Sequence, residues 1–172
     1  MGKRRAGAAE APMRRTPWQR VLVSLGLVLV VAGVSLFGWI GWQMWGTNWV
    51  SERKQADAIE AIQKQWAAGE ESATVPAGRV TSIVRIPRFG DSYAVPILEG
   101  TSDAALAAGF GRFTEGVQPG DQGNFSLAAH RVTHGEPLRD MPDLQPGDEV
   151  IIETREAVYT YVLDTGGDDL VV

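Results

Sequence analysis

The stretch from Val21 to Trp45 contains no charged side chain, and it limits what this chain can fold into more than any other feature. Its residues are mainly Val, Leu, Ile, Gly and Trp. At about 1.5 Å per residue, a helix of this length covers the roughly 30 Å hydrocarbon core of a bilayer with some tilt. Buried helices of soluble proteins seldom run so long without a charge. The stretch therefore predicts a transmembrane helix over residues 21–45.

A cleaved signal peptide is the main alternative for this stretch. Its apolar region would cover about 7–15 residues and would be followed by a cleavage site of small residues. Here the apolar region is longer, and it ends within a cluster formed by Trp39, Trp42, Trp45 and Trp49. Such a cluster is typical of the aromatic belt at a membrane interface. We therefore expect an uncleaved helix that remains in contact with membrane lipid.

The charges on either side of the segment predict its orientation. Residues 1–20 carry six basic side chains and one acidic side chain, whereas the remaining residues carry ten basic and twenty acidic ones. The positive-inside rule then makes residues 1–20 a cytoplasmic tail and places the rest of the chain outside a single-pass cell membrane anchor. The acidic body also argues against a nucleic-acid partner, because duplex binding needs a clustered basic face.

Residues 46–78 are predicted to form a stalk and a linker. The segment Ser51–Ala68 has a helical pattern, since Ile59, Ile62 and Trp66 recur on one face, and Ser51 can cap its start. We interpret this helix as a solvated stalk; the alternative is a helix that binds a partner or the membrane surface. The small residues of 70–78 are typical of a linker.

From residue 79 onward the pattern changes to short strands separated by turns rich in Gly, Pro and Asp. The strands are predicted at 80–86, 94–98, 124–129, 149–154 and 157–163, with a further strand beginning at 170–172 and a short helix at 101–108. Many short strands with regular turn signals indicate an all-β barrel or sandwich. Residues 79–172 are therefore predicted to form an all-β domain.

The chain has only two histidines, His130 and His134, and no cysteine. His130 stands at the end of a predicted strand and opens into a Gly- and Pro-containing loop, which is a common place for a side chain at a site rim. The spacing of the pair also resembles a zinc-binding motif. Arg131 occupies the position where that motif has Glu, and the segment is not predicted to be helical. We therefore expect no metal and no cofactor, and at this point the residues alone leave open whether His130 is catalytic or structural.

One long segment resembles the catalytic-histidine region of the sortases, and most closely that of class E, the housekeeping type of high-GC Gram-positive bacteria. It reads NFSLAAHRVTHGEPLRDMPDLQPGDEV and VYTYVL, preceded by RIPRFGDSYAVPILEGTS, LAAGFGRF and PGDQGNF. The resemblance implies an eight-stranded sortase-type β-barrel with cysteine transpeptidase activity. Such an enzyme cleaves an LPxTG- or LAxTG-like sorting motif of a secreted protein between Thr and Gly. It then links the acyl group to an amine of the peptidoglycan precursor.

The resemblance carries over to single residues only in part. His130 matches the catalytic histidine, whose role is proton transfer. Two positions depart from the family: Ala129 stands where Gly is usual, and Gly111-Arg112-Phe113 stands where GHY is usual. The cysteine of the TLxTC strand and the later arginine have no counterpart. We therefore expect a barrel that lacks its last strands and a chain that is inactive as given. The alternative is a catalytically inactive, membrane-anchored binding module.

Overall fold

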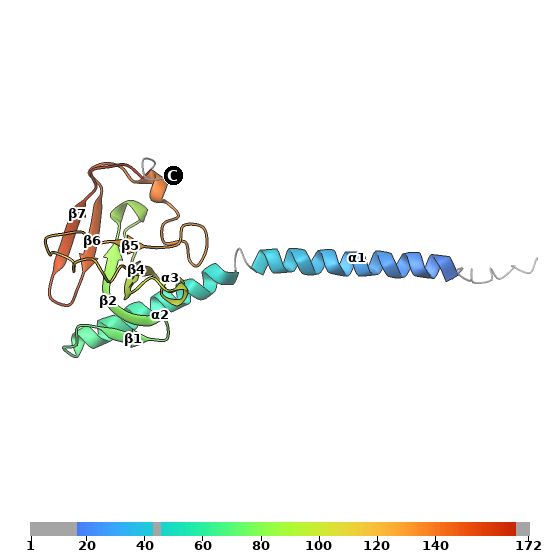
Figure 1. The fold of residues 1–172 in the computed structure, drawn as a ribbon, viewed down its shortest axis with the longest axis horizontal. Coiled ribbons are helices and arrows are strands. Elements are labelled where there is room, and N and C mark those ends of the chain that lie inside the picture. The colour runs from blue at the N-terminus through green and yellow to red at the C-terminus, as the bar shows by residue number, and fades with distance from the viewer. Residues whose placement is uncertain (1–16, 43–45, 168–172) are drawn as a thin grey trace, which may run out of the picture. The chain divides into compact units, whose positions relative to one another are not determined.

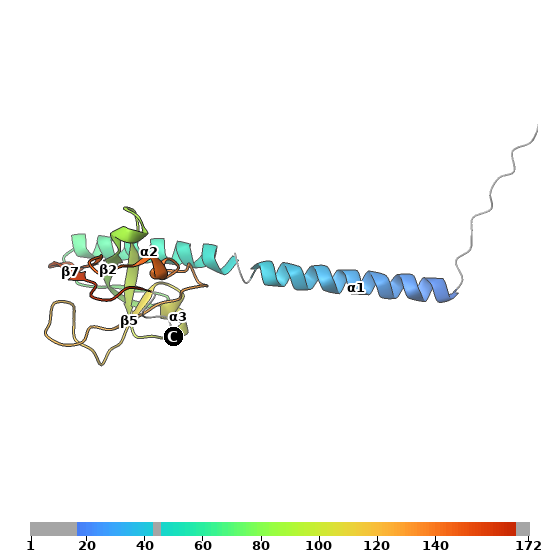
Figure 2. The same cartoon turned by 90° about the horizontal axis from the view of Figure 1, so that it is seen from above.

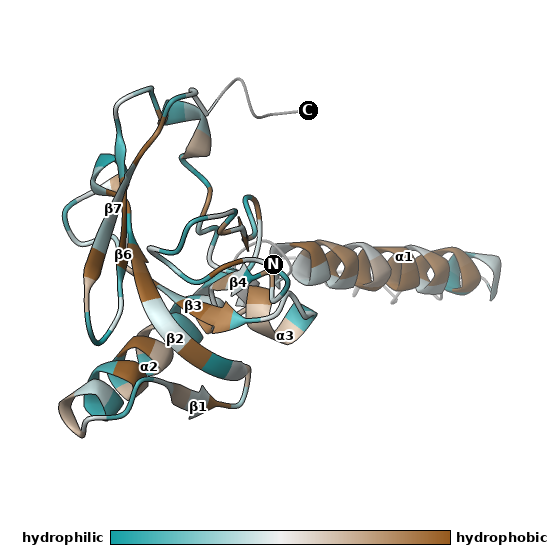
Figure 3. Ribbon diagram, turned by 60° about the vertical axis from the view of Figure 1, so that its left-hand side comes forward, coloured by the Kyte–Doolittle hydropathy of each residue, from teal (hydrophilic) through white to brown (hydrophobic). Residues whose placement is uncertain are grey.

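The computed structural model describes residues 17–42 and 46–167, and internal contacts divide the chain into two units, Met1–Gly41 and Trp42–Val172 (Figure 1). The first unit contains helix α1, Pro17–Gly41, which carries apolar residues along its length (Figure 3). Among the described residues it is the one helix long and apolar enough to cross a membrane, and none of its residues is buried. Proline suits the first turn of a helix because no partner is needed there for its missing N–H.

The ends of the predicted membrane segment differ from those of α1. The helix begins at Pro17 rather than Val21, so the last residues of the predicted tail are already helical, and it ends at Gly41. The rest of the predicted tail, Trp45 and the strand predicted at 170–172 lie outside the described residues.

The second unit begins with helix α2, Thr47–Ala67, and this helix is not a solvated stalk. Figures 1 and 2 show α2 beside the sheet, where it contacts three strands. Ala58 and Ile62 are buried in a cluster with residues of that sheet, and Ile62 is 0% exposed. The prediction of a stalk was wrong because this helix face is covered by the sheet. Ser51 does not cap the helix either, since it lies inside α2 and is buried.

The strands form one seven-stranded sheet with the order β5-β4-β3-β2-β6-β7, and β1 pairs with β2. Their bounds are β1 Ala73–Val75, β2 Gly78–Arg85, β3 Val95–Glu99, β4 Phe110–Arg112, β5 Leu127–Ala128, β6 Glu149–Glu153 and β7 Val158–Val162. Neighbouring strands are antiparallel except β3 and β4, which are parallel and are joined through helix α3, Asp103–Leu106. Two 3₁₀ turns lie at Pro87–Phe89 and Met141–Asp143. The segment 70–78 is thus not a plain linker, because β1 and the start of β2 lie in it.

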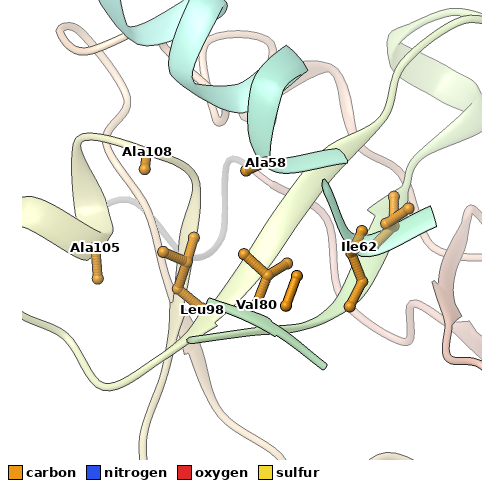
Figure 4. Packing of buried hydrophobic residues seen from close by; sticks show 8 residues of the cluster. Ala58, Ile62, Val80, Leu98, Ala105 and Ala108 are labelled. Carbon is orange, nitrogen blue, oxygen red and sulfur yellow. The ribbon is translucent and has the colours of Figure 1, made fainter. Parts of the chain in front are cut away.

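The sheet has a buried cluster on each face, and an irregularity in β2 supplies side chains to both. The register between β2 and β3 shifts between Val80 and Ser82. A bulge of this kind changes which side chains face each side of a sheet. Val80 and Ile83 therefore belong to the cluster under α2, whereas Val84 belongs to the cluster on the opposite face. Figure 4 shows the first cluster between α2, α3, β2 and β3.

The second unit is therefore a mostly-strand half-barrel with short helices, as the sequence pattern predicted. Within the described residues, β5 and β7 end the strand order, and β1 pairs with β2 alone. Edge strand β5 leads directly into the segment that contains both histidines.

Candidate functional site

His130 lies two residues beyond β5, and β4 determines where that strand runs. Ala128 pairs with Gly111 and Leu127 pairs with Arg112. The strand predicted at 124–129 is shorter in the structure, because its partner β4 is only three residues long. His130 is half-buried in the loop that follows. The structure thus places the predicted catalytic residue at the rim of the sheet.

Arg112 fixes β4 to β3 and to the following loop, and sequence reasoning had given it no role. It is 5% exposed. Its guanidinium donates to both carboxylate oxygens of Glu99 on β3, at 3.1 Å from Nε and 2.7 Å from Nη2. Its Nη1 also donates to the carbonyl oxygens of Phe113, Gly116 and Val117, at 3.2 to 3.4 Å. The signal available in the sequence for a buried role was a single Arg between Gly111 and Phe113.

The two histidines form one stacked pair. Their ring centroids are 4.5 Å apart and the ring planes differ by 25°. Nδ1 of His134 lies 3.0 Å from Oγ1 of Thr133. Burial lowers the pKa of His130 below its ordinary value, the charge of His134 lowers it further, and Asp103 opposes both effects. The imidazole of His130 is therefore mainly neutral near pH 7 and able to accept a proton.

The backbone after the pair takes an unusual course in the segment 130–139, which we call the histidine loop. His134, Gly135 and Glu136 have φ angles of 56°, 80° and 48°, so three consecutive residues are left-handed. For a residue other than Gly, this conformation costs about 1–2 kcal/mol. The amide of Leu138 donates to the carbonyl oxygen of His130 at 3.1 Å and closes the loop. Contacts with other elements must offset the remaining strain.

Helix α2 supplies such contacts at one end of the loop. Oδ1 of Asn48 accepts from the amide of Gly135 at 3.1 Å, and its Nδ2 donates to the Glu136 carboxylate at 2.5 Å. Gly135 also approaches the helix closely: a Cβ there would lie 2.7 Å from Nε2 of Gln55 and 3.3 Å from Cβ of Ser51. Both helix residues are buried. Glycine therefore suits position 135 for two reasons. It adopts the positive φ readily, and α2 leaves too little space for a Cβ there.

Tyr93 holds the other end of the histidine loop. Its hydroxyl donates to the carbonyl oxygen of Pro137 at 2.6 Å. Burial raises the pKa of Tyr93 well above its usual range, and the charge of Asp140 adds to this effect. The hydroxyl consequently stays protonated and remains a donor across the physiological pH range.

Comparison with known proteins shows which class of proteins this chain resembles. Residues 84–166 match the family model described as a sortase domain. The chain is 31% identical over 167 residues to sortase SrtE1 of Streptomyces coelicolor, covering 91% of this chain and 47% of the relative. It is 29% identical over 173 residues to sortase SrtE2 of the same organism, covering 93% and 65%. Residues 84–166 therefore form a sortase domain by this match, and the similarity to sortases extends over most of the chain.

Within that family, the similarity is to class E sortases. The structure of sortase E from Streptomyces avermitilis matches with 38% identity and a TM-score of 0.49, over 54% of this chain and 60% of that one. The chain spans about half the length of the first curated relative and about two thirds of the second.

Proposed function

We propose that this chain carries the histidine-bearing part of a sortase transpeptidase site, with His130 as the proton-transfer residue. The observation that supports it most is the half-buried, mainly neutral imidazole of His130 at the end of edge strand β5, inside the matched sortase domain. The substrates would be secreted proteins with an LPxTG- or LAxTG-like motif. The acceptor would be an amine of the peptidoglycan precursor.

The proposed chemistry needs a group that both accepts and donates a proton. A neutral His130 first takes the proton of a thiol nucleophile and then delivers it to the leaving glycine amine. In the second half it takes a proton from the incoming amine as that amine attacks the acyl-enzyme; the carbon–sulfur bond breaks and the proton returns to the departing thiolate. The chain contains no cysteine. A strand that pairs with the edge of β5 would bring a thiol beside His130, so this edge is where the nucleophile would enter.

A second candidate function follows from the same absence of cysteine. Without a thiol, the 172-residue chain would bind sorting motifs and release them unchanged. We expect no transpeptidation from this chain, because Ser126 and Thr133 lie beside His130 in sequence rather than on a neighbouring strand. A hydroxyl also requires stronger activation than a thiol does.

The test uses the full chain in detergent micelles, a fluorescent LAxTG or LPxTG peptide and an amine acceptor. The chain alone should give no product. A version extended at its C-terminus with a sortase segment that carries a TLxTC strand should give product, and His130→Ala should abolish it. His134→Ala should retain most of the activity. Turnover that survives His130→Ala would overturn the assignment. Tight peptide binding by the extended protein without any turnover would favour the binding module.

We also propose that the chain is a single-pass cell membrane protein with residues 1–20 in the cytoplasm and the sortase domain outside. The helix α1 and the excess of basic side chains before it support this orientation. The domain would then face the cell wall, where its substrates would be found.

A further inference from the structure

We propose that Asn48 of α2 is a positioning residue that holds the histidine loop, and through it the ring of His134, against His130. The contact itself does not depend on the function of His130. Its consequence for catalysis rests on the proposed function.

The side-chain amide of Asn48 matches two adjacent groups of the loop at once. Its oxygen accepts from the amide of Gly135 and its nitrogen donates to the carboxylate of Glu136. Among the residues that the structure describes, Asn48 is the group outside the loop that hydrogen-bonds these two residues. A residue that offered only a donor or only an acceptor would leave one of these loop groups without its partner.

These two residues are where the loop needs support. Gly135 and Glu136 lie in the left-handed run that begins at His134. Backbone in this conformation persists when its surroundings determine it. Arg139 also contacts the Glu136 carboxylate, at 3.3 Å, but its side chain is 73% exposed, so this ion pair contributes little. Asn48, on a helix packed against the sheet, is the rigid partner.

The effect reaches His130 through one residue. His134 precedes Gly135, and its ring stacks on that of His130 at 4.5 Å. If Asn48 releases Gly135, the backbone of His134 loses its constraint and the stacking loosens. The groups that act on the charge of His130 are His134 and Asp103, so its titration reports this change.

The experiment uses the full chain in detergent micelles and NMR, with Asn48→Ala as the test variant. Gln63→Ala is the matched control, because it removes an exposed amide from the same helix. We expect the amide of Gly135 to exchange with solvent on the order of tenfold faster in Asn48→Ala, as expected for the loss of one hydrogen bond. The ring signals of both histidines should shift, and the contacts between the rings should weaken. The control should leave all three unchanged.

A rescue variant separates positioning from a general loss of stability. In the double variant N48D/E136Q, the carboxylate at position 48 accepts a hydrogen bond from the amide of Gly135, as Asn48 does. It also accepts one from the side-chain amide at position 136. The second hydrogen bond therefore joins the same two positions with donor and acceptor exchanged. Exchange at Gly135 and the histidine signals should return to the values of the unchanged chain. If Asn48→Ala does not fold, the double variant decides: recovery supports the proposal, and failure to recover overturns it. Unchanged Gly135 exchange in a folded Asn48→Ala overturns it as well.

These readouts need no activity, so they stand whether or not His130 is catalytic. In the extended version, Asn48→Ala should lower kcat no further than His134→Ala does, with little change in KM, because its effect passes through that ring. A loss of kcat clearly larger than that of His134→Ala would overturn the route through this ring. The expected NMR changes in an extended protein that shows no turnover would instead count against the proposed role of His130.

Discussion

At the scale of single residues, the buried Arg112 and the half-buried His130 are held in contrasting ways. Arg112 is paired on every side, with Glu99 across the strand pair and with three carbonyl oxygens of the next loop. His130 instead has a neighbouring ring and partial access to solvent. The first arrangement favours a fixed structural role, and the second favours a group that exchanges protons.

Replacing Arg112 by Ala should destabilise the domain strongly. The change leaves the carboxylate of Glu99 without its partner in a largely buried setting, which costs about 3–5 kcal/mol when one member of such a pair is removed. Urea unfolding measures the loss. The control is Arg155→Ala, whose ion pairs with Glu71 and Glu156 are exposed and should contribute about 0–1 kcal/mol. Equal effects of the two variants would contradict the structural role of Arg112.

The titration of His130 should link stability to pH in a definite direction. Its pKa in the folded protein lies below the ordinary value of 6.5, so the unfolded chain binds this proton more readily. The free energy of unfolding should therefore be highest above about pH 6.5 and fall as the pH drops toward the folded-state pKa. Denaturant unfolding over this range measures it, and His130→Gln should remove this part of the dependence.

A second variant tests the cause of that pKa shift. The charge of His134 lowers the pKa of His130, so His134→Ala should raise it. An NMR titration of the remaining imidazole measures this directly. A lower pKa of His130 in this variant would contradict the electrostatic effect of His134.

At the scale of secondary-structure elements, the sequence predicted correctly that α2 is a helix. It predicted only part of the face that α2 buries. The prediction relied on the apolar residues Ile59, Ile62 and Trp66 alone. The face that the domain covers contains Asn48, Ser51, Gln55, Ala58 and Ile62, which follow the same helical spacing. Its first half is polar because it contacts a backbone loop, and an apolar pattern cannot reveal such a contact.

The short strands show a related limit. The longer strands β2, β3, β6 and β7 have apolar residues and turn signals that predict them. By contrast, β4 has only three residues, including Gly111 and Arg112, and it exists because it pairs with β3 and β5. His130 could be proposed as a site residue from its motif. Asn48 could not, because it lies far from the loop in sequence.

Replacing Ile62 by Ala should test whether α2 belongs to the folded domain. Ile62 is fully buried under the sheet, so the change should cost about 2–5 kcal/mol. Ile59→Ala is the matched control, because the same side chain is only partly buried there and should cost clearly less. Thermal or urea unfolding measures both. A negligible effect at position 62 would restore the interpretation of α2 as a solvated stalk.

At the scale of the whole molecule, the orientation in the membrane decides whether the domain can meet its proposed substrates. A reporter enzyme that is active only outside the cytoplasm, fused after Val172, should be active in cells. The same reporter fused at Thr16 should be silent, because the basic residues before α1 retain that end inside. The opposite pattern would overturn the proposed location.

The contact between α2 and the histidine loop also has a consequence for how the molecule is made. Asn48 lies 87 residues before Gly135 and 88 before Glu136. A chain that is synthesised from its N-terminus therefore contains the helix long before the loop that covers it. During this interval the first half of the covered face meets water, and its side chains are the amides and the hydroxyl of Asn48, Ser51 and Gln55. A polar face can stay exposed to water during this interval without binding other nascent chains. An apolar face exposed for the same time would bind them.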